Sequence, residues 1–212
     1  MITTDSLPSV RWRSADDVTA VLTVPPAGVL IGADAEMAPV VLPALGPAVT
    51  RLGVLGDQRI AALLAYRLLG VGCLLTVATA EPAHWRRLLR AAGSRAVVGS
   101  SPEGWPPETD EPHLLVSDLP EPPPVELGER PLCTVVHVAG AVPAASAFWP
   151  AVDGVVIAGQ GHGTPLGAVL GRPDASALDT IRPGELGVLD RHRVVAATPI
   201  LADTEREMLL AR

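Results

Sequence analysis

The stretch that most constrains this chain runs from Thr50 to Gly72 and reads TRLGVLGDQRIAALLAYRLLGVG. An apolar strand, Leu52 to Leu55, leads into a turn that contains Gly53 and Gly56, and a helix follows. Asp57 is placed to cap that helix, and Gly70 to end it. Apolar residues recur at helical spacing along one face: Ile60, Leu63, Leu64 and Leu68. A strand, a glycine turn and an amphipathic helix in succession predict an α/β fold.

The same alternation continues along the chain. Because strands that alternate with helices form parallel sheets covered on both sides, we predict a mostly parallel central sheet with helices on both faces. A hairpin about Asp190–Arg193 and a helix at 204–211 end the chain. The pattern predicts strands at 49–55, 73–78, 95–99, 113–118, 132–138 and 154–158, helices at 57–69 and 82–92, a short helix around 143–149, and another that Thr164 caps.

The pattern also predicts how the chain is divided. Residues 1–45 read as a β-rich N-terminal lead-in that includes a hairpin at 28–43, and residues 46–212 form the α/β domain. Two acidic, proline-rich segments, 101–112 and 119–131, have no periodicity and are predicted surface loops.

The charge of the chain is localised. Its net charge is −7, and residues 101–131 hold eight acidic residues against the single Arg130, which accounts for all of it. A nucleic-acid-binding protein needs a basic surplus, so we predict no nucleic-acid partner. The sequence contains no lysine, which excludes a P-loop lysine and a Schiff-base lysine.

Compartment and membrane signals are absent from the sequence. No apolar run reaches the roughly 18 residues that a membrane span needs, and the N-terminus does not resemble a signal peptide. Cys73 and Cys133 each open an apolar run, so we expect buried, reduced thiols. These features favour a cytoplasmic protein.

The turn from Gly53 to Asp57 lies where α/β proteins commonly hold a phosphate. Its spacing is GxxG, which matches neither GxGxxG nor GxxxxGK followed by serine or threonine. The carboxylate of Asp57 would repel a phosphate at the helix start, so we favour a structural cap. A vestigial or alternative ligand site at this turn remains open.

Two other segments are also candidate ligand sites. Asp118 ends an apolar strand and could hold Mg²⁺ together with Asp57, but Leu119 follows where hydrolysis would need a glutamate. The second glycine turn could admit a ligand with His162 as its polar contact, although a tight turn explains it more simply. Its members are Gly159, Gln160, Gly161, His162 and Gly163.

Catalytic and metal signals are missing. The five histidines show no metal spacing, and no serine or cysteine stands beside an evident base, so we assign no catalytic residue, no metal site and no cofactor. One predicted helix has a basic face, which is either solvated or docked on an acidic partner or on membrane headgroups. That face consists of His84, Arg86, Arg87 and Arg90.

The order of the segments resembles a known family. The segments GVLIGADAEMAPVVLPA, RLGVLGDQRIAALLAYRLLGVGCLLTVATAEPAHWRRLLRAAG, PHLLVSD and RPGELGVLDRHRVVAATPILADTEREML resemble the cytoplasmic part of actinobacterial type VII secretion EccE-like proteins. They are more distantly similar to FtsK/EccC-type motor domains with a decayed nucleotide site. In that comparison Gly53–Asp57 occupies the position of the P-loop, and Asp118 occupies the position of the Walker B aspartate. The resemblance therefore implies a fold that is Rossmann-like or degenerate P-loop-like.

The resemblance implies a non-catalytic scaffold or accessory component of a type VII protein secretion system, and not an enzyme. Its partners would be other secretion-complex proteins, including a membrane-bound ATPase, with peripheral association at the inner face of the cell membrane. EccE-like proteins carry N-terminal membrane helices, which this sequence lacks. The alternative is a Rossmann-like protein, enzymatic or not, that binds a nucleotide or small metabolite. The oligomeric state stays open.

Overall fold

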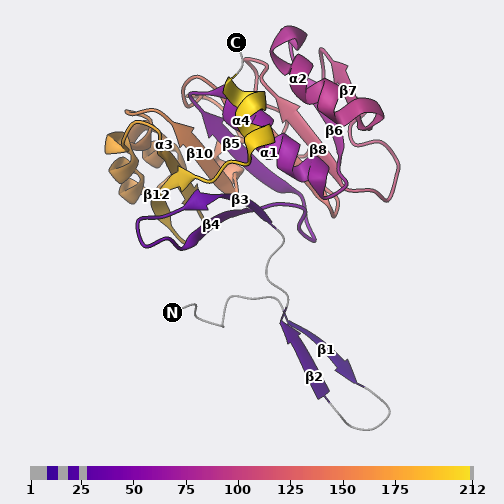
Figure 1. Ribbon diagram of the computed structural model, residues 1–212, viewed down its shortest axis with the longest axis horizontal. Coiled ribbons are helices and arrows are strands. Elements are labelled where there is room, and N and C mark those ends of the chain that lie inside the picture. Colours follow the sequence, from indigo (N-terminus) through magenta and orange to yellow (C-terminus); the bar gives the residue numbers. More distant parts are fainter. Residues whose placement is uncertain (1–8, 14–18, 24–27, 211–212) are drawn as a thin grey trace.

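The computed structural model describes residues 9–13, 19–23 and 28–210 (Figure 1). Within these residues, ten strands form one sheet in the order β4-β3-β12-β11-β10-β5-β9-β8-β6-β7, and β1 (Ser9–Arg13) pairs with β2 (Thr19–Thr23). The strands of the large sheet are β3 (Gly28–Ala33), β4 (Pro39–Pro43), β5 (Thr50–Leu55), β6 (Leu74–Ala78), β7 (Ala96–Gly99), β8 (His113–Ser117), β9 (Cys133–Ala139), β10 (Gly154–Ala158), β11 (Leu186–Asp190) and β12 (Val194–Pro199).

The parallel part of this sheet confirms the predicted fold class. The described strands from β10 through β5, β9, β8 and β6 to β7 run parallel, while β11, β12, β3 and β4 add an antiparallel side. The chain leaves β5 toward β6, and later returns to place β10 on the other side of β5. Because the strand order reverses at β5, the carboxyl end of β5 is where α/β sheets form a binding crevice.

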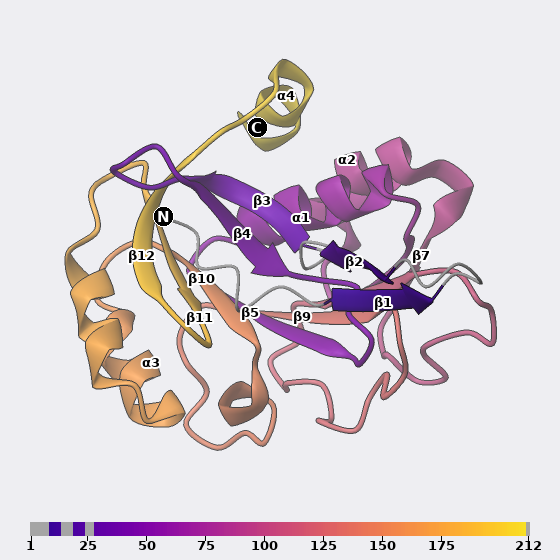
Figure 2. The same ribbon diagram turned by 90° about the horizontal axis from the view of Figure 1, so that it is seen from below.

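Helices cover both faces of the sheet (Figure 2). On one face lie α1 (Gln58–Gly70), α2 (Pro82–Ala92) and α4 (Asp203–Leu210), and on the other lies α3 (Gly163–Leu170). Local chemistry explains the bounds of α2, since proline is tolerated in a first turn and Gly93, at φ 59°, ends the helix. The predicted range 82–92 is therefore confirmed.

Alternating strand residues fill two apolar layers. On β5, Leu52 and Val54 join the layer beneath α1 and α2, while Leu55 joins the layer beneath α3. Every residue of β8 is buried, as expected for a strand inside a sheet covered on both faces. The second layer centres on Phe148 and Trp149, which are 1% and 0% exposed.

Three local predictions were wrong in detail. The segment 143–149 is not an α-helix, since the described chain there forms only the 3₁₀ turn Trp149–Ala151. Before that turn, Ser146 Oγ accepts hydrogen bonds from the N–H groups of Phe148 and Trp149. Thr164 does not cap α3, which already begins at Gly163. Gly70 is the last residue of α1 rather than the residue after it.

The N-terminal hairpin and the acidic loops follow the predictions. The hairpin β3–β4 turns at Asp34, whose Oδ1 accepts from the N–H groups of Glu36 and Ala38, and it joins the large sheet through β12. The loops 101–112 and 119–131 contain no helix or strand, and the Arg130 guanidinium ties them together at the carbonyls of Pro107 and Thr109. The division of the chain at residue 45 stays a prediction.

Membrane-spanning capacity was tested on the same residues. No helix in the described ranges combines the length and the apolar character that crossing a bilayer requires.

Candidate functional site

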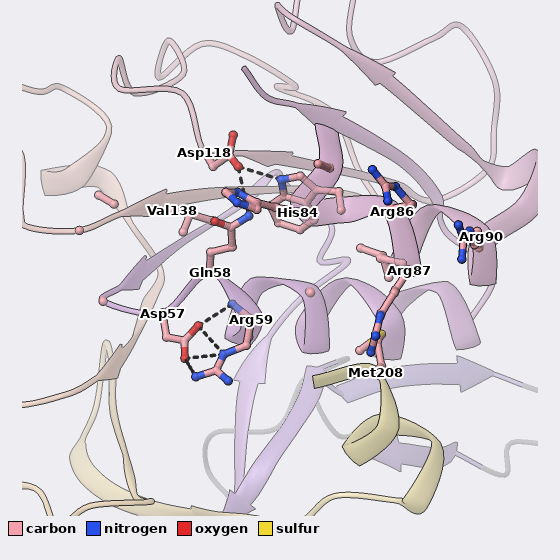
Figure 3. A pocket seen from close by; sticks show the side chains of 17 residues that line it. Asp57, Gln58, Arg59, His84, Arg86, Arg87, Arg90, Asp118, Val138 and Met208 are labelled. Carbon is pink, nitrogen blue, oxygen red and sulfur yellow. Dashed lines mark hydrogen bonds and ion pairs between the residues drawn. The ribbon is translucent and has the colours of Figure 1, made fainter. Parts of the chain in front are cut away.

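A cavity of about 830 Å³ opens at the carboxyl ends of β5, β8 and β9 and extends between α1 and α2 (Figure 3). Its position follows from the topology, since the strand order reverses beside β5. The cavity is lined by Gly56, Asp57, Gln58, Arg59, Ala62, Ala83, His84, Trp85, Arg86, Arg87, Leu88, Arg90, Asp118, Val138, Ala139, Gly140 and Met208.

The start of α1 is occupied by the side chain of Asp57. Its Oδ1 accepts the N–H of Arg59 at 2.9 Å, and its Oδ2 accepts the Arg59 Nη2 at 2.6 Å. Burial opposes the ionised form, but the hydrogen bonds from the Arg59 side chain and backbone hold the pKa of Asp57 below its ordinary value. Asp57 is thus an ionised cap with its own counterion.

The two glycines of this turn are required by neighbouring groups of the protein. A Cβ on Gly53 would lie 2.5 Å from Trp149 Cζ3. Gly56 has a φ of 94°, and a Cβ there would lie 2.1 Å from the carbonyl oxygen of Ala158. The glycines therefore allow close packing and a tight turn, and both functions are satisfied without a ligand.

Asp118 lies at the carboxyl end of β8, on the same edge of the sheet as Asp57. Its Oδ2 accepts the indole N–H of Trp85 at 2.7 Å and the Gln58 amide at 3.5 Å. Figure 3 shows that Asp57 and Asp118 are engaged with different partners. No group of three or more metal-ligating side chains was found within residues 28–210 and the two strands before them.

The second glycine turn lies beside the first, because β10 pairs with β5. The His162 Nε2 would be 3.4 Å from a Cβ on Gly56, but His162 does not line the cavity. Asp179, from the 3₁₀ segment Pro173–Thr180, accepts the N–H groups of Gly163 at 2.6 Å and Thr164 at 3.1 Å. The start of α3 is therefore also filled by a carboxylate.

The basic face predicted for residues 82–92 borders the cavity from α2. His84, Arg86, Arg87 and Arg90 are exposed and line it, and the Arg87 guanidinium donates to the carbonyl oxygen of Glu207 at 3.0 Å. His84 lies 3.2 Å from the Glu81 carboxylate. This end of the cavity is consequently rich in positive charge.

Buried titratable groups elsewhere are structural. Burial lowers the pKa of His137, whose Nδ1 accepts the indole N–H of Trp149 at 3.0 Å while its Nε2 donates to the Leu119 carbonyl. Cys73 and Cys133 are buried free thiols, as predicted, and burial raises the pKa of Cys73 to about 11. These thiols are protonated near neutral pH and are poor nucleophiles.

The ten-stranded, mostly parallel sheet with helices on both faces and a cavity at the carboxyl ends of its strands defines an α/β domain. Among solved structures, the chain is similar to the pCW3 conjugation coupling protein TcpA in its monomer form with ATPγS. The TM-score is 0.56 and the sequence identity 8%, and the match covers 93% of this chain and 78% of TcpA. The packaging NTPase B204 of Sulfolobus turreted icosahedral virus 2 matches with a TM-score of 0.49, 9% identity, and coverage of 72% and 98%.

A third structure is the cytoplasmic domain of the Thermomonospora curvata type VII secretion ATPase EccC, with a TM-score of 0.47, 15% identity, and coverage of 86% of this chain and 31% of that one. No protein-family model matches the sequence, and no curated protein matches it at a significant level. The likeness to TcpA is thus one of fold, and an EccE identity is not shown.

The expectation that this chain is not an enzyme is contradicted by this comparison. TcpA, whose fold it shares with a TM-score of 0.56, is described in a form with ATPγS, so this fold occurs in a protein that binds a nucleotide. The turn nevertheless does not fit a phosphate held in the P-loop manner. The chain has no lysine, and the Asp57 carboxylate already accepts the N–H of Arg59 at the start of α1.

The structure brings together only part of the predicted set. Gly56, Asp57 and Asp118 line the cavity, whereas Gly53 packs on Trp149 and the turn of Gly159, Gly161, His162 and Gly163 lies beside the cavity rather than in it. Sequence reasoning missed Gln58, Arg59 and Trp85. A basic residue two positions after a capping aspartate was a usable signal for Arg59, while no local pattern in the sequence marks Trp85 as a partner of Asp118.

Proposed function

We propose that this chain is an NTPase-fold component of a type VII protein secretion system. In this proposal it works in the cytoplasm at the inner face of the cell membrane, in contact with other secretion-complex proteins that include a membrane-bound ATPase. The observation that carries the proposal is the shared fold over 93% of the chain with TcpA, a coupling protein of conjugation. The segment resemblance to type VII secretion proteins supports the same class of machine.

Two charged regions support a role in contact with partners. The loops 101–112 and 119–131 hold seven acidic residues and one basic residue, Arg130, which holds the two loops together. The exposed face of α2 carries arginines. Opposite charges on separate regions favour specific, oriented association with partners of complementary charge.

The test is affinity purification of the full chain from its native host, with the membrane fraction included. We expect secretion-complex proteins, the ATPase among them, to co-purify in amounts that fall as the salt concentration rises. A matched preparation in which Glu103, Glu108, Asp110 and Glu111 are replaced by serine should retain less of them. Recovery of the chain without any secretion protein, in the membrane and the soluble fraction alike, would overturn the proposal.

A second candidate is nucleotide hydrolysis by the chain itself, favoured by its fold and by Asp118 in a cavity of nucleotide size. It is tested by measuring ATP turnover with Mg²⁺ in the same pure preparation. Turnover that is lost in Asp118→Asn would support this candidate, and turnover that this variant retains would rule out a role for the carboxylate.

A further inference from the structure

The cavity between α1 and α2 has an excess of positive charge although the chain is acidic overall. Among the described residues that line it, four are arginines and two are aspartates, which leaves a surplus of two positive charges. A cavity with low-dielectric walls concentrates the electrostatic field of the charges that line it. The positive charge of the cavity thus contrasts with the rest of the protein, which has a net negative charge.

Neither aspartate offsets the arginines of α2. Asp57 is paired with Arg59, and Asp118 accepts from two uncharged donors, Trp85 and Gln58. Arg87 donates to the main-chain carbonyl oxygen of Glu207, so the case for an unpaired charge concerns Arg86 and Arg90. In the part of the chain that the structure describes, no carboxylate forms an ion pair with Arg86 or Arg90.

The spacing of these arginines suits a ligand with more than one anionic group. Arg86 and Arg90 are four residues apart on α2, and Arg87 and Arg90 are three apart, which places each of these two pairs of positions on one side of the helix. Guanidinium groups bind phosphate through paired, charge-assisted hydrogen bonds. Figure 3 shows Arg86, Arg87 and Arg90 following one another along α2 at one end of the cavity.

We propose that this cavity binds a small soluble molecule that carries two or more adjacent phosphate groups, with the phosphates on the arginines of α2 and not on the N-terminus of α1. Its volume of about 830 Å³ lies in the range of roughly 300 to 1,000 Å³ typical of small-molecule sites. The uncharged remainder of the ligand would lie against the apolar part of the wall, formed by Ala62, Leu88, Val138 and Met208.

The site differs in place from a P-loop site and stands apart from the role in secretion. A P-loop ligand would be held by the free N–H groups of α1, which follows β5, whereas this ligand is held by side chains of α2, which follows β6, the third strand from β5. Loss of the phosphate site would leave the proposed secretion role untouched, and failure to co-purify with secretion proteins would leave the phosphate site untouched.

The experiment is titration calorimetry of the full chain with pyrophosphate, ADP and ATP, in parallel with orthophosphate and with vesicles rich in anionic lipid. We expect pyrophosphate-bearing compounds to bind, orthophosphate to bind more weakly, and affinity to fall with added salt. In the variant Arg86→Ala/Arg90→Ala, affinity should fall at least about tenfold, since each lost charge-assisted hydrogen bond contributes about that much.

The matched control is Arg182→Ala/Arg191→Ala, which removes two exposed arginines outside the cavity. This variant should bind as the unmodified chain does, and thermal unfolding of both variants should show that each is folded. Equal affinity in the two double variants, or no binding of any soluble phosphate compound, would overturn the proposal. Binding to vesicles alone would also overturn it and would point to a lipid surface.

Discussion

Gly53 of β5 lies against the indole ring of Trp149, so closely that a Cβ would come within 2.5 Å of Cζ3 and 2.7 Å of Cη2. The first glycine of the most conspicuous turn in the sequence thus makes room for a tryptophan on the other apolar layer. Trp149 is itself completely buried and donates its indole N–H to His137. This contact gives the glycine a packing role that needs no bound phosphate.

Gly53→Ala should therefore destabilise the fold. Because the added methyl group meets a buried ring that cannot move aside, overpacking should lower the free energy of unfolding by about 1 to 3 kcal/mol. Urea denaturation measures this. In the control Gly70→Ala, the new Cβ at the end of α1 meets nothing within 4 Å, so stability should be unchanged or higher. Equal losses in both variants would contradict the packing role of Gly53.

Asp118→Ala should destabilise through Trp85. Trp85 is 1% exposed, and within the described part of the chain its indole N–H donates to Asp118 at 2.7 Å. Leaving that N–H unpaired should cost about 1 to 3 kcal/mol in the free energy of unfolding. Asp118→Asn keeps an acceptor oxygen and should lose less. If both variants lose the same stability by urea denaturation, the hydrogen bond is not the cause.

Glu205→Ala should separate α4 from α1. Arg67 donates to both carboxylate oxygens of Glu205, at 2.6 and 2.8 Å, and the two side chains are only 13% and 10% exposed. Removing one partner of a largely buried ion pair costs about 3 kcal/mol or more. The exposed Glu207 on the same helix provides the control Glu207→Ala, which should stay within about 0.5 kcal/mol of the unmodified chain.

The Arg67–Glu205 ion pair should also make the free energy of unfolding depend on pH in the acidic range. The hydrogen bonds from Arg67 hold the pKa of Glu205 below its ordinary value near 4.5. The unfolded chain then binds the proton more readily, so this contribution is fully present above pH 4.5 and is lost as the pH falls through the lowered pKa of the folded state. Chemical denaturation between pH 3 and 6 should show a shallower acid loss in Glu205→Ala; an identical pH profile would refute the linkage.

His137 should produce a second pH effect in a higher range. Burial lowers the pKa of His137 from its ordinary 6.5, because the protonated ring is poorly solvated and its Nδ1 is needed as an acceptor for Trp149. Below pH 6.5 the unfolded state therefore takes up the proton first, and stability falls by up to about 1.4 kcal/mol per pH unit until the folded pKa is reached.

The measurement is the free energy of unfolding at pH 5 to 8 for His137→Gln, which keeps an acceptor but does not titrate. The slope of its free energy of unfolding against pH should be smaller, by the equivalent of up to one bound proton. The control His192→Gln, in an exposed turn, should have the same slope as the unmodified chain. His113, whose pKa is also lowered by burial, should contribute to the slope that remains. An unchanged slope in His137→Gln would show that its ring is not the titrating group.

Local sequence signals were sufficient wherever the physical cause is itself local. The bounds of α2 follow from Pro82 and Gly93, and the cap of α1 follows from Asp57, because these residues act on a backbone within a few positions of themselves. The alternation of apolar strands and helices predicted the parallel sheet for the same reason. Asp57 and Asp118 could be placed on one edge, since the carboxyl ends of parallel strands meet there.

Contacts between residues distant in the sequence settled the rest. Gly53 is explained by Trp149, 96 positions later, the start of α3 by Asp179, and the arginines of α2 by a cavity that α1 and three strands complete. No pattern within one segment records which side chain will arrive from another. A glycine turn looks the same in sequence whether it makes room for a phosphate or for an indole ring, and only the packing of the two layers distinguishes them.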